Sequence, residues 1–391
     1  MKLAQRMSKI STSPTIAVMQ LAKRLRKEGV DIIDFGPGEP DFPTPEAVKE
    51  GAMAAIREDF TRYTAVAGTD ELREAIAERY NRDFGCRLTA ENVLTAAGAK
   101  NAIYSLCLAV FEEGDEVLIP APYWVTFPEV VKLAESEPVF FPTLEDKGFV
   151  LDAEDLQAHV NEGSAGLIIN SPNNPSGAVI PDGKLKGVVE VCRRRGIFLL
   201  SDETYDRFTF ENHPFASVAS HMDADEHGWA VCGSFSKTYS MTGWRLGYMI
   251  AHKDLIKKVV SLQSHECGNP CSISQKAALS ALALPPQVVQ HMLDEYASRR
   301  LFVLDELNSM PGMSCPRPYG AFYAFPNVRR CMQNLGCENS VEFSKQLIDQ
   351  ARVATVPGSA FGMEGHIRIS YATSMENLKK GLGRIREFVS G

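Results

Sequence analysis

Five short apolar runs, separated by longer segments of helical character, constrain the fold of this chain more than any other feature. The runs are Val117-Leu118-Ile119, Leu167-Ile168-Ile169, Ile197-Phe198-Leu199-Leu200, Ala230-Val231-Cys232 and 246–250. Runs of this kind predict strands that are buried on both faces, and the helical segments between them predict crossover connections. The sequence therefore indicates an α/β fold with a mainly parallel central sheet and helices on both of its faces.

The segments beside these runs differ in pattern. Apolar residues recur at helical spacing over 71–85, with Thr69 as the expected N-cap and Gly85 as the expected stop. After Ala281 the expected elements are a helix from about 287 to 310, a strand at 322–325, a helix near 341–351, a strand near 366–371 and a last helix that begins with the capping box Thr373-x-x-Glu376. This mixture predicts a smaller α+β domain.

Chain length and composition narrow the organisation and the function class. With 391 residues the chain exceeds the usual size of one core, so we expect a large domain over 46–283 and a small domain formed by 1–45, including an N-terminal arm, and 284–391. The formal net charge of -8, without a Lys/Arg-rich block, argues against nucleic-acid binding. No apolar run is long enough to span a membrane, and residues 1–21 are too polar for a secretory signal. Nine scattered cysteines fit reduced thiols, no metal site is expected, and we expect a cytoplasmic protein.

Polar residues follow three of the apolar runs, at the strand ends where ligands bind in α/β sheets. An Asn-rich turn at 170–177 follows the second run, Asp202 and Tyr205 follow the third, and the loop SFSKTYSMTGWRLGY at 234–248 follows the fourth. Each motif alone also fits a plain turn or a helix cap. Together they offer a lysine amine, a carboxylate, a phenol, hydroxyls and an arginine, which is the set that the aldehyde, ring nitrogen and phosphate of pyridoxal phosphate require.

Eight motifs extend this pattern over almost the whole chain. They are GPGEPDFPTP (36–45), YTAVAGTDELREAI (63–76), PYWVTFPE (122–129), SPNNPSGAV (171–179), SDETY (201–205), SFSKTYSMTGWRLGY (234–248), VPGSAFG (356–362) and HIRISYATS (366–374). In this order they resemble the class I and II aminotransferases, which are fold type I pyridoxal phosphate enzymes, and within them the bacterial aspartate aminotransferase subgroup. The resemblance implies pyridoxal 5'-phosphate bound to the large domain, and a homodimer.

The resemblance also assigns roles to individual residues, with Lys237, Asp202 and Tyr205 as the catalytic ones. Lys237 resembles the lysine that holds the cofactor covalently and acts as general acid and base. Asp202 resembles the partner of the ring nitrogen. The other implied cofactor contacts are Tyr205 and Asn174 to the ring oxygen, Trp124 stacked on the ring, Ser234, Ser236, Arg245 and the backbone of Ala99 and Lys100 at the phosphate, and Tyr63 reaching the phosphate of the neighbouring subunit.

The substrate site is implied in the same way. Arg368 resembles the arginine that grips the α-carboxylate with two parallel hydrogen bonds, and Gly38 resembles a backbone contact to the substrate. Trp124, Asn174 and Lys100 complete this set. The implied reaction is a ping-pong transfer of the amino group of L-aspartate to 2-oxoglutarate, which gives oxaloacetate and L-glutamate.

Two positions depart from other members of the family. Ser264 stands where the animal and enteric type of aspartate aminotransferase has an arginine for the distal carboxylate, so Lys100 is the expected alternative. Ser11 stands where some members that accept prephenate have a basic residue, and Lys9 is out of register. Aromatic, prephenate or alanine-type specificity therefore stays open, as does a C–S β-lyase on the same scaffold.

Overall fold

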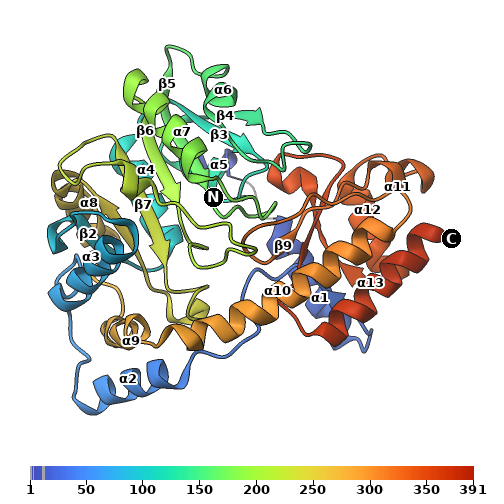
Figure 1. Ribbon diagram of the computed structural model, residues 1–391, viewed down its shortest axis with the longest axis horizontal. Coiled ribbons are helices and arrows are strands. Elements are labelled where there is room, and N and C mark those ends of the chain that lie inside the picture. The colour runs from blue at the N-terminus through green and yellow to red at the C-terminus, as the bar shows by residue number, and fades with distance from the viewer. Residues whose placement is uncertain (1, 3, 11–13) are drawn as a thin grey trace.

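The computed structural model describes residues 2, 4–10 and 14–391, and its centre is a seven-stranded sheet with the order β2-β8-β7-β6-β5-β3-β4 (Figure 1). The strands are β2 (Val93–Ala96), β3 (Glu116–Ala121), β4 (Glu137–Pro142), β5 (Ser164–Asn170), β6 (Phe198–Asp202), β7 (Trp229–Ser234) and β8 (Gly247–Ala251). The pairs from β7 through β6, β5 and β3 to β4 are parallel, whereas β8 pairs antiparallel with both β7 and β2. The prediction of a mainly parallel sheet is confirmed.

Helices cover both faces of this sheet because its strands alternate their apolar side chains between two cores. Leu199 belongs to the first core and Leu200 to the second. The first core includes side chains from α2 (Glu46–Arg57), α3 (Asp70–Phe84), α6 (Ala153–Gln157), α7 (Asp182–Arg195) and α9 (Ser272–Leu282). The second includes side chains from α4 (Ala99–Val110), α5 (Phe127–Leu133) and α8 (Lys253–Glu266).

The smaller α+β part has a core of its own, which contains Phe35, Tyr296, Phe322 and Leu382. Its sheets are β11-β12-β9 and β1-β10, built from β1 (Ile33–Asp34), β9 (Tyr323–Ala324), β10 (Val353–Ala354), β11 (Val356–Pro357) and β12 (Ile367–Ser370). Its helices are α1 (Pro14–Lys27), α10 (Pro286–Ser309), α11 (Arg329–Asn334), α12 (Ser340–Gln346), which continues as a π turn over Leu347–Ala351, and α13 (Met375–Ser390). Figure 1 shows α10 running from beside α9 to this part. The domain limits at 46 and 283 stay a prediction.

Helix ends test the local predictions. The Thr69 side chain accepts a hydrogen bond from the Leu72 amide at the start of α3, and Gly85 ends the helix in the left-handed conformation, as expected. The capping box at Thr373 is wrong, because α13 begins one residue later and Ser374 caps it by accepting from the Asn377 amide. Thr373 instead accepts from the Asn377 side chain. Two adjacent hydroxyls can serve as the cap, and only the tertiary position of the helix selects one.

The described part of the chain contains neither a candidate membrane span nor a candidate metal cluster. None of its helices is both long and apolar enough to cross a membrane. None of its His, Cys, Asp and Glu side chains gather in a set of three or more suited to a metal ion. All nine cysteines are free thiols.

Candidate active site

A pocket of about 340 Å³ opens at the carboxyl ends of β5, β6 and β7. It brings together twelve residues that the sequence analysis placed in the site: Gly38, Ala99, Lys100, Trp124, Asn174, Asp202, Tyr205, Ser234, Ser236, Lys237, Arg245 and Arg368. These residues come from segments separated by up to 330 positions (368 − 38), so only the fold brings them to one place.

Lys237 lies in the loop between β7 and β8, as the apolar flanks of this loop predicted. Its Nζ donates to the Gly38 carbonyl and lies 6.0 Å from the ring centroid of Tyr205. Burial lowers the pKa of Lys237 to about 8, although the nearby carboxylate of Glu39 opposes this shift. A large share of the amine is therefore neutral at pH 8, which is the form that attacks carbonyls and accepts protons.

Asp202 lies at the end of β6 and is buried. Its Oδ1 accepts a hydrogen bond from the Thr204 amide over 3.1 Å. Burial raises the pKa of Asp202 to about 6, while the hydrogen bonds from Thr204 and the charge of Lys237 oppose the shift. A cation placed next to Asp202 in the pocket would stabilise its ionised form.

One corner of the pocket is built to hold an anion. The α4 helix begins there with Ala99, directly after Gly98. Gly98 has a φ of 93°, which side chains rarely allow, and a Cβ added there would lie 2.4 Å from Nη2 of Arg245. Arg245 has a left-handed backbone with a φ of 54°, and its Nη1 donates to the Thr242 carbonyl over 3.0 Å. Helix amides, a guanidinium and the hydroxyls of the 234–236 segment are the donors that phosphate groups bind.

Arg368 lies on β12 and is almost fully buried. Its Nη1 donates to Oδ1 of Asn174 over 2.9 Å and its Nη2 donates to the Gly36 carbonyl over 2.6 Å, but its buried Nε has no hydrogen-bond partner. Because the Asn174 oxygen is occupied by Arg368, the amide NH₂ of Asn174 remains available as a donor. The fork of Arg368 thus faces the pocket with unused donor capacity.

Lys100 and Trp124 line the pocket side by side and contact each other. Nζ of Lys100 lies 5.0 Å from the ring centroid of Trp124, within the range of a cation–π contact. Burial lowers the pKa of Lys100, and the charge of Arg245 lowers it further. Lys100 is therefore a partly desolvated cation that an anionic group would stabilise.

The sequence analysis missed Tyr323, which lines the pocket from β9. Its hydroxyl forms a hydrogen bond of 2.7 Å with the hydroxyl of Tyr205. A Cβ added at Gly38 would lie only 2.6 Å from the same hydroxyl oxygen, so this position requires glycine. Tyr323 is the one residue with a hydroxyl in the aromatic segment 322–325, and that was the available signal.

Several residues of the sequence analysis lie elsewhere. Tyr63 is 98% exposed and does not line the pocket. Ser264 is exposed on α8, where its Oγ donates to the Ser261 carbonyl, and Lys9 is also exposed. Ser11 lies outside the described residues.

The charge balance of the pocket is its most informative property. Four cations line it, namely Lys100, Lys237, Arg245 and Arg368. None of the four forms an ion pair with a carboxylate among the residues that the structure describes, and one buried acid, Asp202, faces them. A buried cation without a carboxylate partner, such as Arg368, is costly, and the other three cations add positive charge around it. The pocket is therefore suited to a small molecule that carries more than one negative charge.

Comparison with known proteins gives a consistent result. The chain matches the family described as aminotransferase class I and II over residues 30–385. It is 42% identical to the probable aspartate/prephenate aminotransferase of Aquifex aeolicus over 98% of both chains, and 40% identical to the aspartate aminotransferase of Geobacillus stearothermophilus over 100% of this chain and 99% of that protein. Its structure matches that of the aspartate aminotransferase from Thermus thermophilus with maleate, with a TM-score of 0.93, 36% identity, and coverage of 99% of this chain and 100% of that chain.

These matches span nearly the full length of the chain and confirm the resemblance drawn from the motifs. The chain therefore belongs to the class I and II aminotransferases, transaminases whose cofactor is pyridoxal phosphate.

Proposed function

We propose that this enzyme transfers the amino group of L-aspartate to 2-oxoglutarate in a ping-pong reaction, with the residue roles given below. The observation that carries the proposal is the set of four cations without carboxylate partners in the described part of the pocket, opposite one buried acid. A cofactor phosphate and the two carboxylates of aspartate would together neutralise them. The names of the relatives, aspartate or aspartate/prephenate aminotransferase, support the same substrate class.

The residues of the pocket fit pyridoxal phosphate. The anion corner at the start of α4 matches a phosphate, and the buried carboxylate of Asp202, whose pKa is raised by burial, matches a protonated ring nitrogen. When bound, the cofactor supplies an aldehyde for the amine and an electron sink for the α-carbon. The residues that would hold it are Ala99, Lys100, Ser234, Ser236 and Arg245 at the phosphate, Tyr205 and Asn174 at the ring oxygen, Asp202 at the ring nitrogen, Trp124 at the ring face and Lys237 at the aldehyde.

Lys237 is the residue proposed to move the proton. With a pKa of about 8, its Nζ can accept a proton from the substrate α-carbon and release it again near neutral pH. The Gly38 carbonyl accepts a hydrogen bond from this nitrogen and so orients it before substrate enters. Lys237 would thus serve as covalent anchor and as general acid and base.

Arg368 and Lys100 are proposed to bind the two carboxylates of aspartate. The planar fork of Arg368 suits the α-carboxylate, with Gly38, Asn174 and Trp124 beside it. Lys100 is the proposed partner of the distal carboxylate, since it is partly desolvated and lies over Trp124. Ser264 has no place in this proposal, because it does not line the pocket.

We further propose a cytoplasmic homodimer in which Tyr63 reaches the phosphate of the neighbouring subunit. An aromatic side chain that is 98% exposed is suited to contact a partner subunit, since its burial stabilises an interface. The nine free thiols support a reducing compartment. The division into a large domain over 46–283 and a small domain from 1–45 and 284–391 is part of this proposal, and α10 would connect the two.

The experiment that tests the substrate is a half-reaction. L-Aspartate, L-phenylalanine, L-alanine and the amine product of prephenate are each added to holoenzyme without a 2-oxo acid, and the loss of the visible absorption of lysine-bound cofactor is followed. We expect aspartate to bleach this band at the lowest concentration. If another donor bleaches it while aspartate does not, the transaminase assignment stands but the aspartate proposal is wrong.

A further inference from the structure

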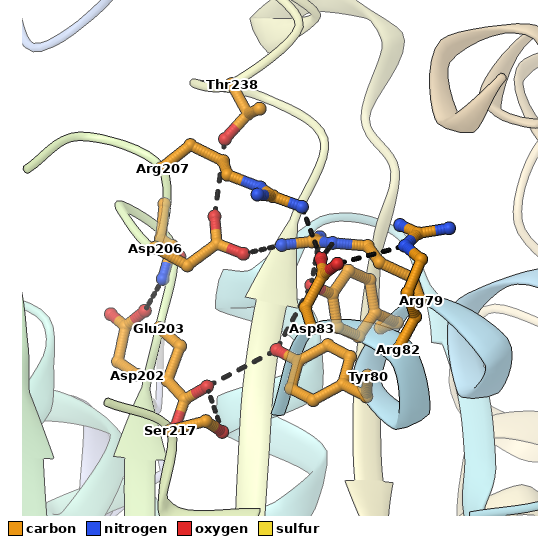
Figure 2. Close-up of polar contacts among 12 residues, drawn as sticks. Arg79, Tyr80, Arg82, Asp83, Asp202, Glu203, Asp206, Arg207, Ser217 and Thr238 are labelled. Atoms are coloured by element: carbon orange, nitrogen blue, oxygen red, sulfur yellow. Dashed lines mark hydrogen bonds and ion pairs between the residues drawn. The ribbon is translucent and has the colours of Figure 1, made fainter. Parts of the chain in front are cut away.

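A buried polar network lies next to the pocket, made of side chains that do not line it. Each of three pocket residues is followed in sequence by a buried side chain of this network. The pairs are Asp202 and Glu203, Tyr205 and Asp206, and Lys237 and Thr238. Figure 2 shows how these side chains meet Arg79 and Tyr80 of α3.

The centre of the network is a buried ion pair between Arg79 and Asp206. Nη2 of Arg79 donates to Oδ2 of Asp206, and both side chains are at most 4% exposed. The guanidinium is held from two further sides, because Nη1 donates to the Tyr248 hydroxyl over 3.2 Å and Nε lies 3.5 Å from Oδ2 of Asp83. Breaking a buried ion pair is costly, and Arg79 also contacts Tyr248 and Asp83. The side chain of Asp206 is therefore held firmly in one position.

Thr238 connects Asp206 to the lysine loop. Its hydroxyl donates to the free oxygen of Asp206, Oδ1, over 3.3 Å, and Thr238 is buried (Figure 2). The segments 204–208 and 235–241 are turns that follow β6 and β7. Within the described residues, the hydrogen bond from Thr238 to Asp206 is the one that joins these two turns. Side-chain contacts, rather than a regular ladder, therefore decide how Lys237 lies relative to Tyr205.

We propose that Thr238, held by Asp206 and Arg79, is a positioning residue that sets where the Lys237 amine lies relative to Asp202 and Tyr205. This inference rests on the proposed role of Lys237 as the anchor of the cofactor. Without the hydroxyl, the turn that carries Lys237 loses its tie to the Tyr205 turn, and the amine adopts its reactive position less often.

The test compares two reactions of the full-length, cofactor-free protein. In the first, Lys237 captures pyridoxal phosphate: its nitrogen forms a C=N bond to the aldehyde carbon and the aldehyde oxygen leaves as water, which shifts the absorption band away from that of the free aldehyde. In the second, pyridoxamine phosphate, which has no aldehyde, binds to the same pocket without reacting. A positioning role affects the first reaction, whereas damage to the pocket affects both.

Thr238→Val is the informative variant, because it keeps the shape and removes only the hydroxyl. We expect the capture rate constant to fall about ten-fold, with unchanged affinity for pyridoxamine phosphate, and Thr238→Ser to stay within about two-fold of wild type. Thr355→Val is the matched control, since Thr355 is also buried with one hydroxyl hydrogen bond, to Ser344, and lies outside the pocket. Asp206→Asn is less suitable because it leaves Arg79 as a buried charge without its partner.

The outcomes are separable. Capture by Thr238→Val at the wild-type rate, or an equal loss of capture and of pyridoxamine phosphate affinity, would overturn the positioning role. A band shift that is missing in the wild type, or that also occurs in Lys237→Ala, would instead overturn the proposed function of Lys237.

Discussion

The guanidinium carbon of Arg368 lies 4.5 Å from the ring centroid of Tyr323, and 5.1 Å from that of Phe361 on another side. The two rings hold the guanidinium by cation–π contacts, and Asn174 and Gly36 fix its in-plane orientation. Because the arginine is ordered before substrate arrives, little entropy remains to be lost when a carboxylate binds.

Replacement of this arginine tests the α-carboxylate proposal. We expect Arg368→Lys to lower kcat/KM for aspartate about 100-fold, because an ammonium replaces a bidentate, ring-stacked fork. The rate of the half-reaction against aspartate concentration measures it. Arg193→Lys is the control, since Arg193 pairs with Glu190 and Glu226 at an exposed site, and it should leave the rate unchanged. Equal rates for wild type and Arg368→Lys would contradict the proposal.

Burial of the Lys237 amine carries a stability cost that a substitution should reveal. In the folded cofactor-free protein the pKa of Lys237 is about 8, below its ordinary value of 10.5, so the unfolded chain binds more protons between these values. The stability of the wild type therefore rises as the pH increases from 8 to 10.5.

Lys237→Met should accordingly raise the free energy of unfolding of cofactor-free protein by about 2 kcal/mol at pH 7, with a smaller gain at pH 10.5. Urea unfolding at the two pH values measures the difference. Lys257→Met, on the exposed face of α8, should change stability by less than about 0.5 kcal/mol at both. A gain that does not depend on pH would mean that desolvation of the amine is not its cause.

Lys100→Ala tests the binding of the distal carboxylate. We expect KM for aspartate to rise about ten-fold or more, with a much smaller change for phenylalanine, because only aspartate offers a second carboxylate to this cation. Half-reaction kinetics with both donors measure the ratio. Lys132→Ala is the control, since Lys132 forms an ion pair with Glu129. Equal losses for aspartate and phenylalanine would assign Lys100 to the cofactor phosphate alone.

Mixing two variants that we expect to be inactive alone, Tyr63→Ala and Lys237→Ala, tests whether Tyr63 acts across subunits. In a heterodimer of Tyr63→Ala and Lys237→Ala chains, one site combines an intact Lys237 with the intact Tyr63 of the other chain. An equal mixture, unfolded and refolded together, should recover about a quarter of wild-type activity, because half of the dimers are mixed and each has one complete site. No recovery, with mixed dimers demonstrated by mass, would place Tyr63 in its own subunit's site, and an active Tyr63→Ala variant would place it outside any site.

The lysine loop illustrates how far local sequence carries. Its apolar flanks predicted that Lys237 lies between two buried strands, and β7 and β8 confirm this. The antiparallel direction of β8 was not predicted, because apolar runs carry no direction and the connection of twelve residues from 235 to 246 is just long enough for a parallel crossover.

The amino-acid sequence by itself indicated five of the seven strands of the large sheet and the ends of α3, because apolar runs and caps are local signals. Its motifs, through their resemblance to a family, indicated twelve of the residues that line the pocket. Only the tertiary structure decided that the ring of Tyr323 packs against Arg368 and that Ser374 rather than Thr373 caps α13. It also decided that Thr238 donates to Asp206, which pairs with Arg79. Those relationships join residues far apart in the chain or choose between equivalent neighbours. They depend on how whole elements pack, because contacts between distant segments, and not the local sequence, make one arrangement lower in free energy than its alternatives.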